Sequence, residues 1–156
     1  QLALYVTMYS PLQMAADLPE NYLKYPDAFQ FIKDVAVDWQ DSKYLEAEPG
    51  DYITVARKAK NSSTWFVGAI TDENKRMASV NLSFLDNNKL YIATIYADGA
   101  DADWQMNPKA YQIKKFVVKS NQVLQIPLAP GGGCAISIKP AAEEDVKGVP
   151  AYKGKW

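Results

Sequence analysis

Histidine is absent from the 156-residue sequence, and cysteine occurs once, as Cys134. Without histidine the chain cannot build a Ser-His-Asp triad, a Cys-His pair or a histidine-ligated metal site. A single cysteine excludes an intrachain disulfide and a thiolate zinc cluster. Any catalytic hypothesis must therefore rest on carboxylates, lysines or tyrosines.

An excess of charge of one sign is also missing. Lysine and arginine total 17 against 18 acidic residues, so the formal net charge is -1. This balance gives no basic surplus that would attract nucleic acid or an anionic membrane. No apolar stretch is long enough for a transmembrane helix, since Pro11 and Gln13 interrupt the uncharged residues 1–16. Length and composition, with 48% hydrophobic residues, fit one globular domain.

The uncharged first segment has the periodicity of a helix. Its apolar residues recur at helical spacing, and they are Leu2, Tyr5, Met8, Tyr9 and Leu12. The opposite face is apolar as well, so such a helix would need to be covered on every side. We therefore predict that these five residues form an interface with mass outside this chain. The alternative is a helix tucked under loops of its own domain.

The remaining chain is predicted to be mainly β. Residues 1–25 form the terminal helix, which Ser10-Pro11 kinks or breaks, and a loop. Residues 26–42 form a connector, for which we favour a short helix over about residues 27–34 with Asp27 as its N-cap. A strand is the alternative, because apolar residues also alternate between positions 29 and 39. An antiparallel β-sandwich of about eight strands then occupies residues 43–140, because apolar residues alternate with polar ones between turn clusters. The expected strands lie at residues 52–58, 65–70, 79–84, 90–96, 111–118, 123–128 and 134–139, and residues 141–156 form a surface tail pinned by Tyr152 and Trp156.

Acidic residues gather in the segment from Asp98 to Asp103. Asp98, Asp101 and Asp103 are oxygen ligands spaced two or three residues apart, which can suit Ca²⁺. The spacing matches no EF-hand loop, and ordinary turn chemistry is the competing interpretation. Neighbouring acids elsewhere, such as Asp17 and Glu20, do not by themselves indicate a catalytic pair.

Two tryptophans are candidate sugar-stacking residues. Trp104 lies in a polar loop and Trp65 begins an apolar strand, although aromatic residues in strands more often belong to a core or an interface. The run of glycines at positions 131–133 lacks the lysine and the helix of a phosphate-binding loop, so we interpret it as a hairpin turn.

Several longer motifs resemble glycoside hydrolase family 97, in the order in which that family has them. Ser-Pro-Leu-Gln-Met-Ala-Ala-Asp-Leu-Pro-Glu-Asn-Tyr at residues 10–22 resembles the end of the family's catalytic barrel. The segment 28–39 is similar to the connector that follows. Strand and closing motifs are similar at residues 50–57, 65–71, 95–104, 107–108 and 128–136, so that the resemblance covers about residues 1–140.

The resemblance implies an accessory role for this chain. The family's enzymes are bacterial α-glucosidases and α-galactosidases with an N-terminal β-sandwich, a calcium-dependent barrel and a C-terminal β domain. Its catalytic carboxylates and calcium ligands lie upstream of the matching segment, so no catalytic residue and no cofactor is assigned to this chain. The implied partners are the rest of the parent glycosidase and a further copy of the chain, and the implied location is periplasmic, cell-surface or secreted.

Two functions remain open from the sequence. The first is a non-catalytic C-terminal domain that braces the barrel of an α-glycosidase and mediates oligomerisation. The second is a carbohydrate-binding β-sandwich module that uses Trp104 or Trp65. The chain alone is not expected to be an enzyme.

Overall fold

The computed structural model describes residues 1–154 and 156, and over these residues it contains eight strands and three short helices. The strands are β1 (Trp39–Glu48), β2 (Tyr52–Ala59), β3 (Trp65–Thr71), β4 (Arg76–Asn81), β5 (Leu90–Asp98), β6 (Tyr111–Val118), β7 (Val123–Leu128) and β8 (Gly133–Ala141). The helices α1 (Leu4–Thr7), α2 (Pro19–Tyr22) and α3 (Pro26–Asp34) precede them.

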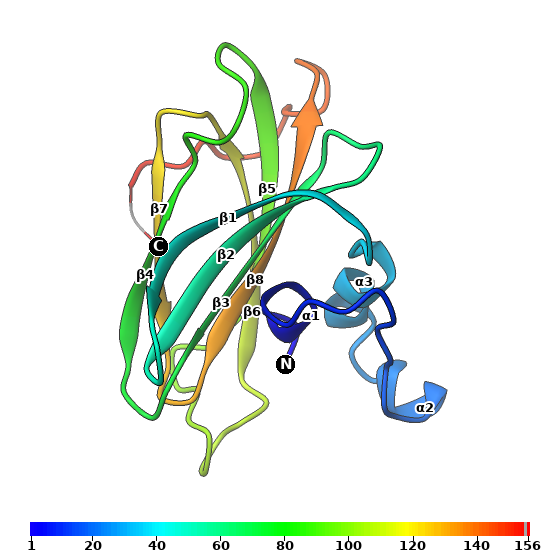
Figure 1. The fold of residues 1–156 in the computed structure, drawn as a ribbon, viewed down its shortest axis with the longest axis vertical. Helices are drawn as coiled ribbons and strands as arrows, with labels where there is room; N and C mark the ends of the chain where they lie inside the picture. The colour runs from blue at the N-terminus through cyan, green and yellow to red at the C-terminus, as the bar shows by residue number, and fades with distance from the viewer. Residues whose placement is uncertain (155) are drawn as a thin grey trace.

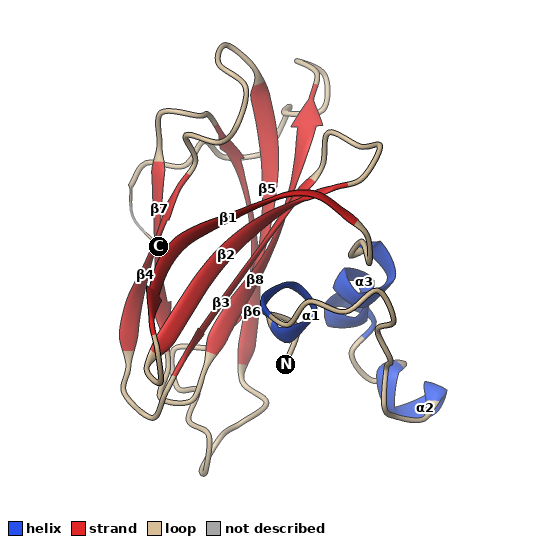
Figure 2. Cartoon of the chain, viewed as in Figure 1, coloured by secondary structure: helices blue, strands red, loops and turns tan. Residues whose placement is uncertain are grey.

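The strands form a sandwich of two unequal antiparallel sheets, as the sequence predicted. The larger sheet has the order β1-β2-β3-β8-β5-β6, and the smaller sheet pairs β4 with β7. The small sheet covers one face of the large sheet, and the helices gather on the opposite face (Figure 1 and Figure 2). The large sheet is therefore the middle of three layers.

Each side of the large sheet has its own core, because alternate residues of a strand point to opposite faces. In β3, Trp65, Val67 and Ala69 face the small sheet, whereas Phe66 faces the helices. The helix-side core joins Val6 and Phe31 to Phe66 and Tyr96, and all four side chains are buried. The apolar run at residues 65–70 thus forms a strand that is covered on both faces.

The first helix is shorter than predicted and it packs on its own domain. It ends at Thr7, and Met8 already has an extended backbone with φ -95° and ψ 105°. Ala3 and Val6 are buried against the sheet, so the prediction of a helix that is covered only by mass outside the chain was wrong for this first turn. Gly68 of β3 permits this approach, since a Cβ atom there would lie 2.7 Å from the Ala3 carbonyl oxygen.

Other predicted boundaries also differ from the structure. The segment expected to be a loop contains α2, and α3 begins at Pro26 with Tyr25 as its N-cap instead of Asp27. The sheet begins at Trp39, earlier than the predicted range 43–140. The predicted strand at residues 79–84 ends at Asn81, because Leu82 turns inward and its carbonyl accepts the Leu85 N–H. In the tail, Tyr152 is buried against the core, as predicted.

Candidate functional site

The Asp98 carboxylate organises the turn between β7 and β8. Its Oδ2 accepts backbone N–H groups from Ala129 and Gly133, each at 2.9 Å. Gly132 lies so close that a side chain at this position would collide with the Asp98 carboxyl group. The glycine run therefore forms a tight turn around one acid, as the hairpin interpretation predicted, and it does not form a phosphate-binding loop.

Burial raises the pKa of Asp98 above 3.8, and its two N–H donors oppose this shift only in part. A carboxyl with a raised pKa binds its proton more tightly in the folded chain, so this group makes the fold less stable as the pH rises through that pKa. Ionised Asp98 is consequently a cost to folding at neutral pH.

Asp98→Asn should therefore leave stability unchanged or increase it at about pH 7, because the amide oxygen still accepts both N–H groups without a buried charge. Asp98→Ala should lower the free energy of unfolding by about 1–3 kcal/mol, because both N–H groups lose their acceptor. Urea unfolding at several pH values checks this. The advantage of Asp98→Asn over the unsubstituted chain should shrink as the pH falls, and an advantage that grows instead would contradict the assignment.

The three aspartates of the predicted calcium site do not converge. Asp101 accepts the Asn107 side-chain amide at 2.9 Å, and Asp103 accepts the N–H groups of Gln105 and Met106. Asp98 faces the β7–β8 turn instead. Among the residues that the structure describes, no group of three or more acidic or cysteine side chains could hold a metal ion. The calcium prediction for Asp98, Asp101 and Asp103 was therefore wrong in geometry, and turn chemistry accounts for all three.

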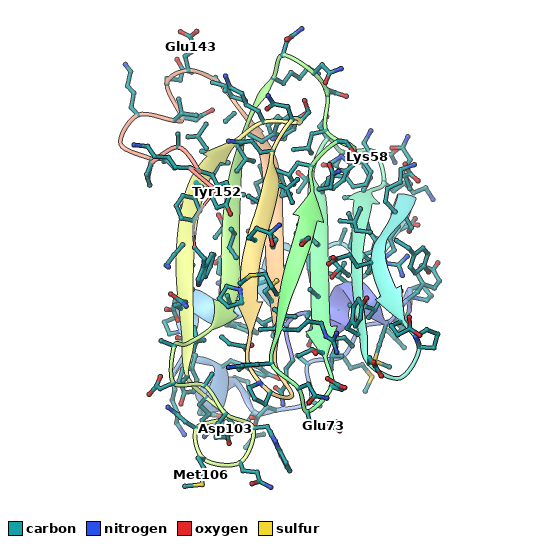
Figure 3. The ribbon with its side chains drawn as sticks, turned by 90° about the vertical axis from the view of Figure 1, so that its left-hand side faces the viewer. Lys58, Glu73, Asp103, Met106, Glu143 and Tyr152 are labelled. Atoms are coloured by element: carbon teal, nitrogen blue, oxygen red, sulfur yellow. The ribbon has the colours of Figure 1, made fainter. Side chains whose placement is uncertain are left out.

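The two candidate sugar-binding tryptophans lie in different environments. Trp65 is 6% exposed in the core between the sheets, where its ring packs at a tilt against Phe84 with 4.6 Å between the centroids, so no sugar can reach its face. Trp104 is 55% exposed and lies against Gly131. It belongs to the loop that carries Asp103 and Met106 at one end of the molecule (Figure 3). Sugar stacking on Trp104 stays a prediction, whereas the assignment of Trp65 was wrong.

The five predicted interface residues divide into two groups. Leu2 and Tyr5 pack against the helix-side core, so they hold the segment to its own sheet. Met8, Tyr9 and Leu12 are exposed by 62–73%, as an interface requires. Three further apolar side chains, Met14, Leu18 and Leu23, are equally exposed but were not predicted. We call the six exposed residues the apolar strip. The uncharged stretch that continues past Leu12 to Ala16 could have indicated Met14, whereas Leu18 and Leu23 lie beyond it among polar residues.

Arg57 of β2 fixes the point at which the apolar strip leaves the sheet. Its Nε donates to the Val6 carbonyl and its Nη1 donates to the Ser42 hydroxyl, both at 2.7 Å. The guanidinium also lies 5.7 Å from the centre of the Tyr9 ring. This buried side chain therefore positions Met8 and Tyr9, although no pattern in the sequence distinguishes Arg57 from other charged residues.

Comparison with known proteins decides the family. Residues 38–139 match the family model described as "Glycosyl-hydrolase 97 C-terminal, oligomerisation". The chain belongs to this family. It is a C-terminal accessory domain of a glycoside hydrolase, and its matched residues comprise nearly the whole sandwich, without the helices.

Relatives of this family 97 domain are much longer proteins. The retaining alpha-galactosidase of Bacteroides thetaiotaomicron is 40% identical over 139 residues, which are 89% of this chain and 20% of the relative. A family 97 enzyme from Pseudoalteromonas sp. strain K8, solved in complex with acarbose, is 49% identical with a TM-score of 0.88. That match covers 90% of this chain and 22% of the solved one. The domain thus spans about a fifth of the length of these relatives.

Within the described residues of the family 97 domain, no helix is long and apolar enough to cross a membrane.

Proposed function

We propose that this domain braces the catalytic barrel of an α-glycosidase through the apolar strip and also holds copies of the enzyme together. The apolar strip is the observation that carries the proposal, since six large apolar side chains over residues 8–23 lie in water when the domain is alone. Covering apolar surface contributes roughly 25 cal/mol per Å². A protein surface of this kind normally marks an interface.

The proposal assigns catalysis to the rest of the enzyme. The chain has no histidine, and the carboxylates of Asp98, Asp101 and Asp103 each accept hydrogen bonds from different loop backbone or amide groups and do not converge on one site. We infer that an α-galactoside is the substrate of the parent barrel, because one relative is named a retaining alpha-galactosidase. An α-glucoside is the alternative that the family resemblance implies. Calcium in that barrel and export to the periplasm or cell surface are proposed from the family resemblance alone.

A hydrophobic dye tests the apolar strip. The isolated chain should enhance the dye's fluorescence, and Met8→Ser/Leu12→Ser/Met14→Ser should reduce that enhancement several-fold, because these side chains supply the exposed apolar surface. The matched control Met77→Ser/Met106→Ser/Val123→Ser changes three side chains that are also exposed but lie elsewhere. It should retain the enhancement. Equal losses in both triple variants would contradict the assignment of the strip.

The same preparations test the absence of catalysis. No turnover of nitrophenyl α-glycosides is expected, and turnover that survives purification would overturn the accessory role.

A further inference from the structure

The edge strands of the two sheets are the places where two copies of this domain could pair through backbone hydrogen bonds. An edge strand presents unpaired N–H and C=O groups, which pair readily with another strand unless the protein blocks them. In the described part of the chain the edges are β1 and β6 in the large sheet and β4 and β7 in the small one. Figure 3 shows β6 and β1 on opposite sides of the large sheet.

The β1 edge is unsuited to pairing with another copy. Its register with β2 shifts twice, between Trp39 and Asp41 and again between Tyr44 and Glu46. Such bulges twist an edge away from a flat partner. The strand also carries four charged side chains, at positions 41, 43, 46 and 48, so the same strand of a second copy would meet both irregular backbone and charge.

Side chains block the two edges of the small sheet. The Ser79 N–H of β4 donates to the Glu46 carboxylate at 2.9 Å. The Gln125 N–H of β7 donates to the Tyr152 hydroxyl, also at 2.9 Å. Further along β7, Pro127 has no N–H to offer. Both edges are therefore occupied near their centres.

The β6 edge is regular, and the tail covers only its upper part. All eight of its residues pair with β5 without a shift of register. On the outer side, the Val117 N–H donates to the Pro150 carbonyl at 2.9 Å, and the Val117 carbonyl accepts the Tyr152 N–H at 3.0 Å. In an antiparallel strand every second residue points its backbone groups to the same side. Tyr111, Ile113 and Lys115 therefore direct theirs outward, as Val117 does.

Within residues 1–154 and 156, no hydrogen bond from outside the sheet reaches the backbone of Ile113 or Lys115. The outward N–H and C=O groups of these two residues therefore have no partner in the described part of the chain. We propose that the edge from Tyr111 to Lys115 pairs antiparallel with the same edge of a second copy, which joins the two large sheets into one. This inference rests on the proposed oligomerisation and names the surface that performs it.

The register follows from side-chain charge. If the two-fold axis passes through position 113, Ile113 of one copy pairs with Ile113 of the other. Lys115 of the second copy then lies directly opposite Tyr111 of the first, and both side chains are on the same face of the sheet. The Tyr111 hydroxyl donates to the Asp27 carboxylate at 2.8 Å, so the arriving ammonium group meets an acid. A register centred on Lys115 would instead oppose two lysines. The tail at Val117 ends the pairing, and so short an interface gives a dimer that dissociates on dilution.

Cysteine cross-linking tests both the edge and the register. In this register the two Cα atoms at position 113 lie about 5.5 Å apart, so the thiols of Ile113→Cys are within disulfide range, whereas the two Cα atoms at position 115 lie about 14 Å apart. The native Cys134 is buried and does not compete. With oxidised glutathione as the oxidant, Ile113→Cys should run at twice the monomer mass on a non-reducing gel and Lys115→Cys should stay monomeric. Circular dichroism confirms that both variants fold.

The outcomes separate this inference from the proposed function. Suppose that the chain is dimeric by light scattering but does not cross-link at position 113, or cross-links equally at position 115. This result would contradict pairing through the β6 edge in the stated register, while oligomerisation itself would still hold. A chain that is monomeric at every concentration overturns both.

Discussion

Replacing Phe31 by alanine should lower the free energy of unfolding by about 3–5 kcal/mol, which is the range for a fully buried phenylalanine. Phe31 is the side chain through which α3 enters the helix-side core, and it is 0% exposed. Its ring makes edge contacts with Phe66 at 5.9 Å and with Tyr96 at 5.3 Å between centroids. The cavity left by alanine would remove the main attachment of the helical layer, and urea unfolding measures the loss.

Phe29→Ala is the matched control for this experiment. Phe29 belongs to the same helix but is only partly buried, and it stacks on Tyr22 at the periphery. Phe29→Ala should lower the free energy of unfolding clearly less than Phe31→Ala does. If the two variants were equally stable, the helical layer would not be held by the core described above.

Gly68→Ala should lower the free energy of unfolding by about 1–3 kcal/mol, which is the usual cost of overpacking a filled interior. The added Cβ atom would lie 2.7 Å from the Ala3 carbonyl oxygen and 2.9 Å from the Val6 Cβ. Because one of these contacts is with backbone, only movement of α1 away from the sheet relieves it. Thermal unfolding followed by circular dichroism detects the change.

Deleting residues 1–8 distinguishes this collision from a general intolerance of β3 to substitution. In the shortened chain the atoms that collide with the new methyl group are gone, so Gly68→Ala should be nearly neutral relative to its own parent. If Gly68→Ala lowered the free energy of unfolding of the shortened chain as much as that of the full chain, α1 would not be the cause.

The sandwich could be predicted from sequence where its strands alternate. Residues 123–128 were predicted with the observed bounds, since Leu124, Ile126 and Leu128 repeat at every second position and face the core between the sheets. Residues 111–118 were also predicted with the observed bounds, although two lysines interrupt their alternation. The first strand was largely missed for the opposite reason. Its two bulges break the alternation, and its four charged residues give it the polar composition that is typical of a loop.

The candidate sites were harder to predict because they depend on contacts between distant segments. The aspartates at 98, 101 and 103 are neighbours in sequence, yet Asp98 is drawn away by the turn at residues 129–133. The first helix appeared unpartnered because nothing in residues 1–16 reveals that Gly68 leaves room for it. Likewise, which sheet edges stay free depends on Glu46 and Tyr152, which reach the edges from other strands or from the tail.

Light scattering of the isolated 156-residue chain over a range of concentrations shows whether copies of this domain associate. We expect a mass that rises from 17.4 kDa in the most dilute samples towards twice that value as the concentration increases. A mass that stays at the monomer value in the most concentrated solutions would contradict the proposed association.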